Sequence, residues 1–193
     1  MTTIILASSS PYRQELLNTL GLAFEAHAPD VDETRLTNEG PRDLVARLAE
    51  KKARALASRF SKALIIGSDQ VALCDGQVLT KPITHERAFE QLRLCSGKSV
   101  EFSTGLCLLN SETGSIQCEV EPFVVRFREL SDEQIHGYLY KEEPYDCAGS
   151  FKCEGLGVAL FERFDGRDQN ALVGLPLILL VKMLGVEGVD PLV

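Results

Sequence analysis

The 193-residue sequence has no hydrophobic run close to the roughly 20 residues that a membrane-spanning helix requires. Its longest apolar stretch, residues 175–181, is short and is interrupted by Pro176. Residues 1–7 lack the basic start that is typical of a secretory signal peptide. We therefore expect no membrane association and a cytoplasmic location.

The sequence also lacks an excess of basic side chains. It has 20 lysines and arginines against 28 aspartates and glutamates, which gives a net charge of −8. A protein that binds nucleic-acid polymers needs basic residues to displace counterions from the phosphates. We therefore expect no nucleic-acid partner, and any phosphate group must be bound by a local basic cluster, a metal ion, or both.

Several common site motifs are missing as well. The six cysteines form no CxxC pair and the three histidines are isolated, which argues against a zinc site. Because most cysteines have apolar neighbours, we expect reduced thiols in the core. Residues 97–99 read Gly-Lys-Ser, but Leu92 occupies the position where a P-loop needs its first glycine.

What the sequence does contain is an alternation of strand-like and helix-like segments, and 45% of its residues are hydrophobic, enough for a core. Strands are predicted at about 3–7, 63–67, 71–73, 77–79, 100–109 and 116–127, with Asp69 just after the end of the apolar strand 63–67. Helices are predicted at about 11–20, 41–60, 85–95, 132–141 and 176–185. Residues 144–174 are glycine-rich and read as strand-like. The pattern favours a mixed α/β sheet with helices on its faces, in one domain over residues 1–193.

Lys52 is unusual within the predicted helix 41–60. At 100° per residue it falls between Leu48 and Leu56, near the middle of the apolar stripe. Lysine is rarely buried without a partner. Its side chain could extend to the surface along the helix, or it could point into a site.

Six charged residues are together typical of a polyphosphate site, and all but Lys52 lie in loops or near the ends of predicted elements. They are Arg13, Asp32, Glu33, Lys52, Asp69 and Lys81. Phosphoanhydride hydrolysis needs cations for the phosphate oxygens, carboxylates for a metal ion and a base for water. The same residues could also be ordinary surface charges in salt bridges.

Six segments then show a joint resemblance to a known family. They are residues 6–13 (LASSSPYR), 31–33 (VDE), 67–70 with 81–82 (GSDQ and KP), and 148–151 with 173–176 (AGSF and VGLP). In order and spacing they resemble the Maf family of nucleoside triphosphate pyrophosphatases, over essentially the whole chain.

This resemblance implies cleavage of a nucleoside triphosphate between its α and β phosphates, giving a nucleoside monophosphate and pyrophosphate. It implies a divalent cation (Mg²⁺, Mn²⁺ or Co²⁺) and a possible homodimer. It also implies the elongated α/β fold of the inosine triphosphate pyrophosphatases, with two lobes around a cleft.

The resemblance assigns roles to individual residues. Asp69 matches the catalytic acid that activates water and binds metal, and Glu33 matches a second carboxylate at the metal. The residues that match the phosphate-binding set are Ser8, Ser9, Ser10, Arg13, Lys52 and Lys81.

Three positions resemble the branch of the family that acts on 7-methyl-GTP, namely Tyr12, Gln70 and Glu154. N7-methylguanine is cationic, so an aromatic ring and a carboxylate suit it, and the Gln70 amide can bind a base edge. That branch commonly has tryptophan at the position of Tyr12. The alternatives are a pyrophosphatase for other canonical or modified nucleotides, and a non-catalytic nucleotide-binding regulator of cell division.

Overall fold

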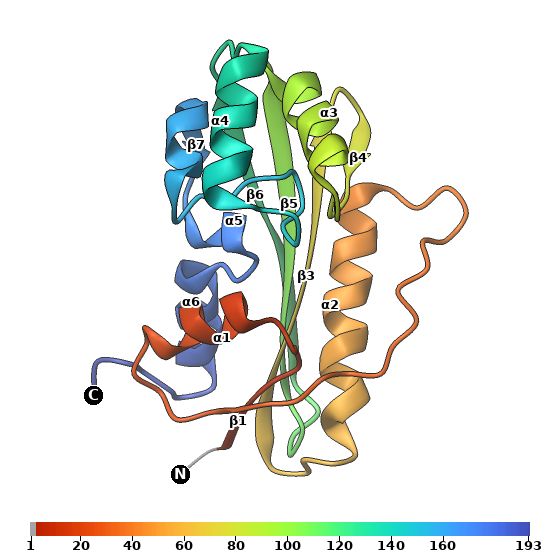
Figure 1. The fold of residues 1–193 in the computed structure, drawn as a ribbon. Coiled ribbons are helices and arrows are strands. Elements are labelled where there is room, and N and C mark those ends of the chain that lie inside the picture. Colours follow the sequence, from red (N-terminus) through yellow and green to blue (C-terminus); the bar gives the residue numbers. More distant parts are fainter. Residues whose placement is uncertain (1–2) are drawn as a thin grey trace. The chain divides into compact units, whose positions relative to one another are not determined.

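The structure is a computed structural model that describes residues 3–193 (Figure 1). The chain folds into two compact units. Unit 1 holds residues 3–70, 103–121 and 168–193, and unit 2 holds residues 71–102 and 122–167. Three long strands, β3 (Ala63–Cys74), β5 (Ser99–Asn110) and β6 (Ile116–Phe127), contribute residues to both units.

The strands form one mixed seven-stranded sheet in the order β2-β1-β3-β5-β6-β7, with β4 paired to β3. β1 (Thr3–Leu6) runs parallel to β2 (Glu25–Ala26) and to β3. β4 (Gln77–Leu79) is antiparallel to β3, and β7 (Phe161–Gly166) is antiparallel to β6. The predicted mixed α/β fold, a sheet flanked by helices, is confirmed.

In unit 1, successive side chains of the strands alternate between two cores, as the period of a strand requires. The first core joins Ile4, Leu64 and Ile66 to α1 (Pro11–Asn18) and α6 (Leu177–Val186). The second joins Ile5 and Ile65 to α2 (Pro41–Ala57). Even-numbered residues of β3 therefore face α1 and α6, and odd-numbered residues face α2.

Two glycines allow α2 to approach the sheet closely. A Cβ atom on Gly67 would lie 2.8 Å from the backbone nitrogen of Ala53 and closer still to the carbonyl oxygen of Ala49. A Cβ atom on Gly105 would meet the backbone of Val45 in the same way. Only a residue without a side chain fits between helix and sheet at these positions.

The Gly67→Ala substitution is therefore expected to lower the free energy of unfolding by about 1–3 kcal/mol or more, because α2 has to move away from β3. Chemical denaturation measures this loss. Gly137→Ala is the matched control, since a Cβ on Gly137 meets nothing within 4 Å and alanine favours the α4 helix (Asp132–Glu142). An unchanged midpoint in Gly67→Ala would contradict the close approach of helix and sheet.

Unit 2 contains α3 (His85–Cys95) and α4, which pack together, with β4, β7 and a 3₁₀ helix at Leu156–Leu160. Its core includes edge-to-face contacts among Phe127, Phe151 and Phe161. The strand-like prediction for residues 144–174 is wrong over most of its length. Only β7 is a strand there, and α5 (Asn170–Val173) is a short helix.

The expectation of reduced cysteines is wrong for one pair. Cys107 on β5 and Cys118 on β6 form a disulfide. The two strands are neighbours in the sheet and bring the two Cα atoms to 4.2 Å, a separation typical of directly opposed residues. Within residues 3–193, Cys74, Cys95, Cys147 and Cys153 take part in no disulfide.

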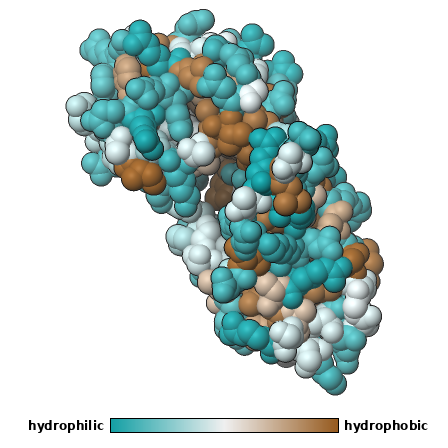
Figure 2. Space-filling model, turned by 90° about the vertical axis from the view of Figure 1, so that its right-hand side faces the viewer, coloured by the Kyte–Doolittle hydropathy of each residue, from teal (hydrophilic) through white to brown (hydrophobic). Residues whose placement is uncertain are grey.

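Within residues 3–193, no helix combines the length and the apolar character of a membrane span. On the face drawn in Figure 2, hydrophilic side chains cover most of the surface and hydrophobic patches are small.

Candidate active site

The candidate site in unit 1 is built around Asp69, which lies near the middle of β3 and not after a strand end as predicted, because the strand continues through residues 68–74. As an odd-numbered residue of that strand, Asp69 faces α2, and its side chain is 12% exposed. Its neighbours Ser68 and Gln70 point to the opposite face of the sheet. The strand therefore presents a carboxylate on one face and two polar side chains on the other.

Lys52 on α2 meets Asp69 and is almost completely buried. Its Nζ lies 2.6 Å from Oδ1 of Asp69 and 2.8 Å from Oε1 of Glu33, and its side chain is only 8% exposed. This arrangement resolves the unusual position of Lys52 on an apolar stripe, because the ammonium group points into a cluster of carboxylates and not to the surface. Gly67, two residues before Asp69, keeps α2 close enough for this contact.

The environment of Asp69 raises its pKa above the ordinary value, and burial is the main cause. The charge and hydrogen bond of Lys52 and the charge of Arg13 act in the opposite direction, while the like charge of Glu33 adds to the increase. A carboxylate with a raised pKa is a better proton acceptor than an exposed aspartate. Asp69 therefore has the properties of a general base.

The serine-rich loop leads into α1 as the sequence predicts. Ser10 is the N-cap, and its Oγ accepts a hydrogen bond from the backbone N–H of Arg13, while Pro11 is the first helical residue. Ser8 is buried and its Oγ accepts a hydrogen bond from the N–H of Ser10, whereas Ser9 is exposed. Loop hydroxyl and N–H groups thus gather at a helix N-terminus, where anions are favoured.

Arg13 is fixed by the backbone. Its Nε donates to the carbonyl oxygen of Gly174 at 2.8 Å. Burial lowers the pKa of Arg13, and the charges of Asp69 and Glu33 oppose this effect, so the guanidinium lies within electrostatic range of both carboxylates. Arginine remains charged in proteins, and Arg13 thus adds a second cation to the Lys52 cluster.

Residues 170–174 form a clamp on β3 that the sequence analysis did not predict. Ser68 Oγ donates to the carbonyl oxygen of Gly174 at 2.8 Å, the oxygen that Arg13 also contacts. Gln70 Nε2 donates to the carbonyl oxygen of Ala171 and to Oγ1 of Thr104. The residues on both sides of Asp69 are therefore anchored. Gly174 adopts φ 104°, which favours glycine, and this glycine before Leu-Pro was the available signal.

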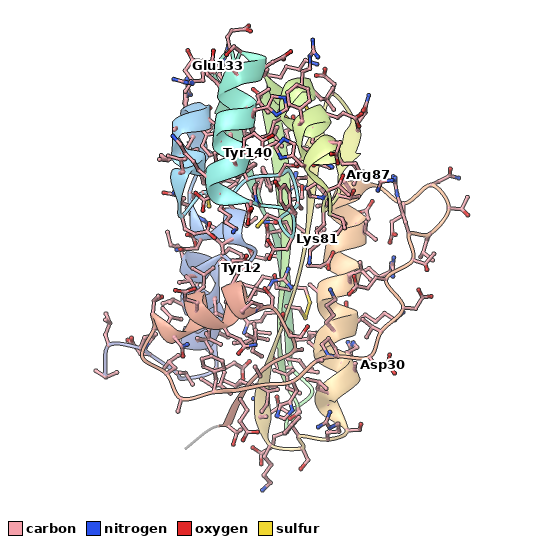
Figure 3. The ribbon with its side chains drawn as sticks, viewed as in Figure 1. Tyr12, Asp30, Lys81, Arg87, Glu133 and Tyr140 are labelled. Carbon is pink, nitrogen blue, oxygen red and sulfur yellow. A yellow bond between two sulfur atoms is a disulfide. The ribbon has the colours of Figure 1, made fainter. Side chains whose placement is uncertain are left out.

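The remaining predicted residues are placed as follows. Tyr12 is half-buried on α1, where Figure 3 labels it. Lys81 and Glu154 belong to unit 2, and both are exposed, Lys81 in the segment after β4 and Glu154 just before the 3₁₀ helix. The structure thus brings together Arg13, Glu33, Lys52 and Asp69 within unit 1.

Glu33 and Asp69 could hold a divalent cation. Both carboxylates contact the Lys52 ammonium, which shows that a positive group can sit between them. In the part of the chain that the structure describes, no group of three or more His, Cys, Asp or Glu residues is placed to hold a metal ion. Two carboxylates with substrate phosphates are a donor set typical of Mg²⁺.

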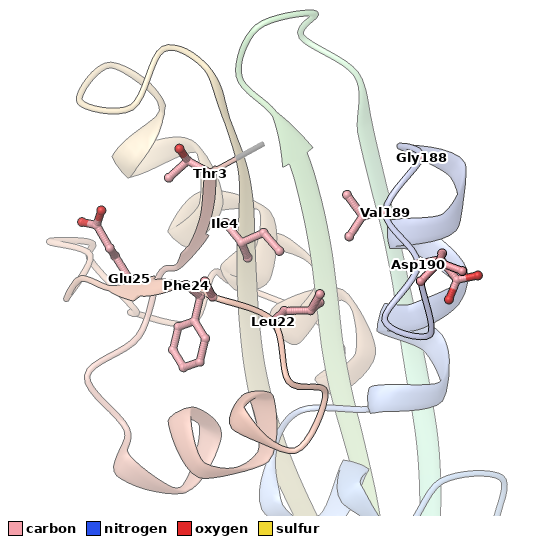
Figure 4. Close-up of a pocket in the computed structure, with 10 residues that line it drawn as sticks. Thr3, Ile4, Leu22, Phe24, Glu25, Gly188, Val189 and Asp190 are labelled. Atoms are coloured by element: carbon pink, nitrogen blue, oxygen red, sulfur yellow. The ribbon is translucent and has the colours of Figure 1, made fainter. Parts of the chain in front are cut away.

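A separate pocket of about 640 Å³ in unit 1 contains none of these residues. It lies between the β1–β2 region and the C-terminal segment (Figure 4), and its lining includes Ile4, Phe24, Glu25, Val189 and Asp190. We do not assign this pocket to the candidate site.

Comparisons with known proteins agree with the motifs. The family described as "Maf-like protein" matches residues 3–186. A protein of Nitrosococcus oceani named 7-methyl-GTP pyrophosphatase is 58% identical over 186 residues, which cover 96% of this chain and 94% of that protein.

Two solved structures show weaker likenesses. The Ham1 protein of Staphylococcus aureus matches with a TM-score of 0.43 and 15% identity, over 68% of this chain and 73% of that chain. A Vibrio cholerae protein matches with a TM-score of 0.43 and 9% identity, over 96% of this chain and 98% of that chain.

Proposed function

This chain belongs to the Maf family, and from that premise we propose that it hydrolyses 7-methyl-GTP to 7-methyl-GMP and pyrophosphate. The observation that carries the proposal is the 58% identity, over nearly the full length, to a protein named for that activity. The cluster of Asp69, Lys52, Glu33 and Arg13 supplies the base, the cations and the carboxylates that the reaction needs.

The reaction breaks the bond between the α-phosphorus and its bridging oxygen. Asp69 accepts a proton from water, the water oxygen bonds to the α-phosphorus, and pyrophosphate leaves with the bridging oxygen. Arg13, Lys52 and Lys81 hold the phosphate oxygens, together with the loop of Ser8, Ser9 and Ser10. The clamp on Ser68 and Gln70 keeps Asp69 in place.

We propose that a divalent cation (Mg²⁺, Mn²⁺ or Co²⁺) binds Glu33 and Asp69. When bound, it neutralises negative charge on the phosphate oxygens. The family assignment does not decide between these metals.

Selectivity for the methylated base is proposed to come from its fixed positive charge. Tyr12 stacks on the ring as a cation–π partner, and Glu154 adds Coulomb attraction that neutral guanine does not feel. The amide nitrogen of Gln70 is engaged with Thr104 and Ala171. We therefore propose that Gln70 accepts a hydrogen bond from the base edge through its amide oxygen.

Glu154→Gln is expected to lower kcat/KM for 7-methyl-GTP by up to about fivefold, the upper value for an exposed charge pair, and to leave GTP hydrolysis nearly unchanged. Glu162→Gln, another exposed carboxylate of unit 2, is the control. Tyr12→Trp should keep or improve selectivity, because tryptophan is the better cation–π partner. Equal losses on both nucleotides in Glu154→Gln would contradict its role in base recognition.

The test of the overall proposal is a pyrophosphate-release screen of canonical and methylated nucleotides with Mg²⁺, Mn²⁺ and Co²⁺. We expect 7-methyl-GTP to give the highest kcat/KM. Turnover of a different nucleotide would support another substrate within the family. Tight nucleotide binding without any product would indicate a regulator and contradict the enzyme.

The substrate that we propose is a small molecule of the cytoplasm, which is the location that we propose for the protein. A homodimer is also proposed on the basis of the family resemblance.

A further inference from the structure

A buried carboxylate in unit 1 fastens the segment that carries the clamp on β3. Asp168 is only 3% exposed and lies just before α5. Its Oδ1 accepts hydrogen bonds from the backbone N–H and the side-chain amide of Asn170, each at 2.9 Å. Its Oδ2 accepts a hydrogen bond at 2.7 Å from the backbone N–H of Ile178, ten residues further along the chain. One side chain therefore holds both ends of the segment 170–178.

The bond to Ile178 supplies the cap of α6. This helix starts at Leu177 after Pro176, whose side chain offers no acceptor. The first N–H groups of a helix have no partner within the helix, and a carboxylate is a favourable partner for them. Because Ile178 is the second helical residue, Asp168 does from outside the helix what an N-cap side chain does from its end. The start of α6 is thereby tied to the start of α5.

The carbonyl oxygen of Gly174 lies within this fastened segment. It accepts hydrogen bonds from Nε of Arg13 and from Oγ of Ser68, both at 2.8 Å. Ser68 has a second acceptor, the carbonyl oxygen of Gly105 at 2.9 Å, and β3 is also paired with its neighbours in the sheet. Among the described hydrogen bonds, the guanidinium of Arg13 donates only to Gly174. A shift of the segment thus displaces Arg13 more than it displaces β3.

We propose that Asp168 is a positioning residue for the hydrolysis: it fixes the carbonyl oxygen of Gly174, which in turn fixes the guanidinium of Arg13 against the substrate phosphates. This inference rests on the proposed function, in which Arg13 binds phosphate oxygens. A guanidinium binds two oxygens of a phosphate only when its planar fork is aligned with them. A displaced Arg13 keeps its charge and loses this alignment, so phosphate binding weakens.

Asp168→Asn and Asp168→Ser test the proposal with 7-methyl-GTP and Mg²⁺. Asparagine has one acceptor atom in place of two, and serine has a single oxygen that can still bond locally to Asn170. Each variant therefore loses part of the link between Asn170 and Ile178. We expect KM to rise by up to about 10²-fold, the loss that a misplacement of about 1 Å can cause. The value of kcat should stay near that of the wild type, because the phosphates are bound before as well as during the reaction.

Ser131→Ala is the matched control for a loss of stability, because it removes the N-cap of α4 in unit 2. The melting temperature should fall in all three variants, whereas KM should rise only in the two Asp168 variants. If one of these two does not fold, the other carries the comparison. A lower kcat at unchanged KM would mean that only the folded fraction had dropped, and it would overturn the proposal.

A double-variant cycle shows whether Asp168 acts through Arg13. Arg13→Lys keeps the positive charge and removes the Nε donor that contacts Gly174. Adding Asp168→Asn to this background should therefore raise KM much less than it does in the wild type. An equal rise in both backgrounds would show that the two residues act independently, and the proposal would be wrong.

Turnover by the wild type decides the proposed function separately. If the wild type hydrolyses a different nucleotide, KM is compared for that nucleotide, since Arg13 is proposed to bind phosphate and not the base. If it hydrolyses none, calorimetric titration with inorganic pyrophosphate and Mg²⁺ replaces the kinetics. A weaker dissociation constant in Asp168→Asn would then support the role of Asp168, and equal dissociation constants would overturn it.

Discussion

Asp69→Asn is expected to lower kcat by about 10²–10⁴, the range for loss of a general base. Asparagine keeps the size of the side chain and removes both the proton acceptor and one negative charge at the proposed metal. Glu33 still neutralises Lys52 in this variant, so circular dichroism and the melting temperature should change little. Steady-state kinetics with saturating 7-methyl-GTP and metal measure the effect.

Asp75→Asn is a suitable control for Asp69→Asn. Asp75 follows the end of the same strand and pairs with Lys98 on the surface. Its backbone φ of 49° is one that asparagine tolerates, so activity should stay at the wild-type value. If Asp69→Asn kept more than roughly a tenth of wild-type turnover, well outside the range for a general base, Asp69 would not be the base.

Lys52→Met is expected to lower the free energy of unfolding at neutral pH by about 3–5 kcal/mol, the usual cost of removing one partner of a buried ion pair. The substitution removes the counter-charge that contacts the buried Asp69 carboxylate directly and leaves the charge of Arg13 to act on it. Because Lys52 also holds phosphate in the proposed mechanism, kcat/KM should fall too. Urea denaturation of both proteins provides the measurement.

The effect of Lys52→Met should depend on pH in a defined direction. Lys52 lowers the pKa of Asp69 against the increase that burial causes, so its removal raises that pKa further. The loss of stability is then largest above the raised pKa and shrinks as the pH falls through it, because a protonated carboxyl needs no counter-charge. In the pH profile of kcat/KM, the fall on the acidic side should therefore occur at a higher pH in Lys52→Met than in the wild type.

Two controls separate this ion pair from a general effect of charge removal. Lys51→Met removes an exposed lysine whose described hydrogen bond goes to the carbonyl oxygen of Asp32. It should change the free energy of unfolding by less than about 0.5 kcal/mol.

The second control is Lys52→Met in the Asp69→Asn background, where the loss of free energy of unfolding should be much smaller than in the wild type. Equal costs in the two backgrounds would contradict the coupling of Lys52 to Asp69.

Most helices could be predicted from the sequence because their ends carry strong local signals. Ser10 with Pro11, Thr84, and Ser131 with Gln134 cap their helices as predicted. The two-residue strand β2 was missed, because its pairing with β1 depends on tertiary contact. Residues 144–174 were misjudged because glycine-rich segments have weak local preferences.

The sequence also revealed the main element of the candidate site. A lysine on an apolar stripe and an acid after a buried apolar run placed Lys52 and Asp69 in one candidate site, and the structure adds their direct contact. The clamp could not be predicted, because it depends on the carbonyl oxygens of Ala171 and Gly174, which have no side-chain signature.

The most direct test of the proposed function is product analysis by phosphorus-31 NMR after incubation of 7-methyl-GTP with the protein and Mg²⁺. The account predicts equal amounts of 7-methyl-GMP and pyrophosphate, with no orthophosphate, and slower conversion of GTP under the same conditions. Release of orthophosphate with 7-methyl-GDP would contradict cleavage between the α and β phosphates.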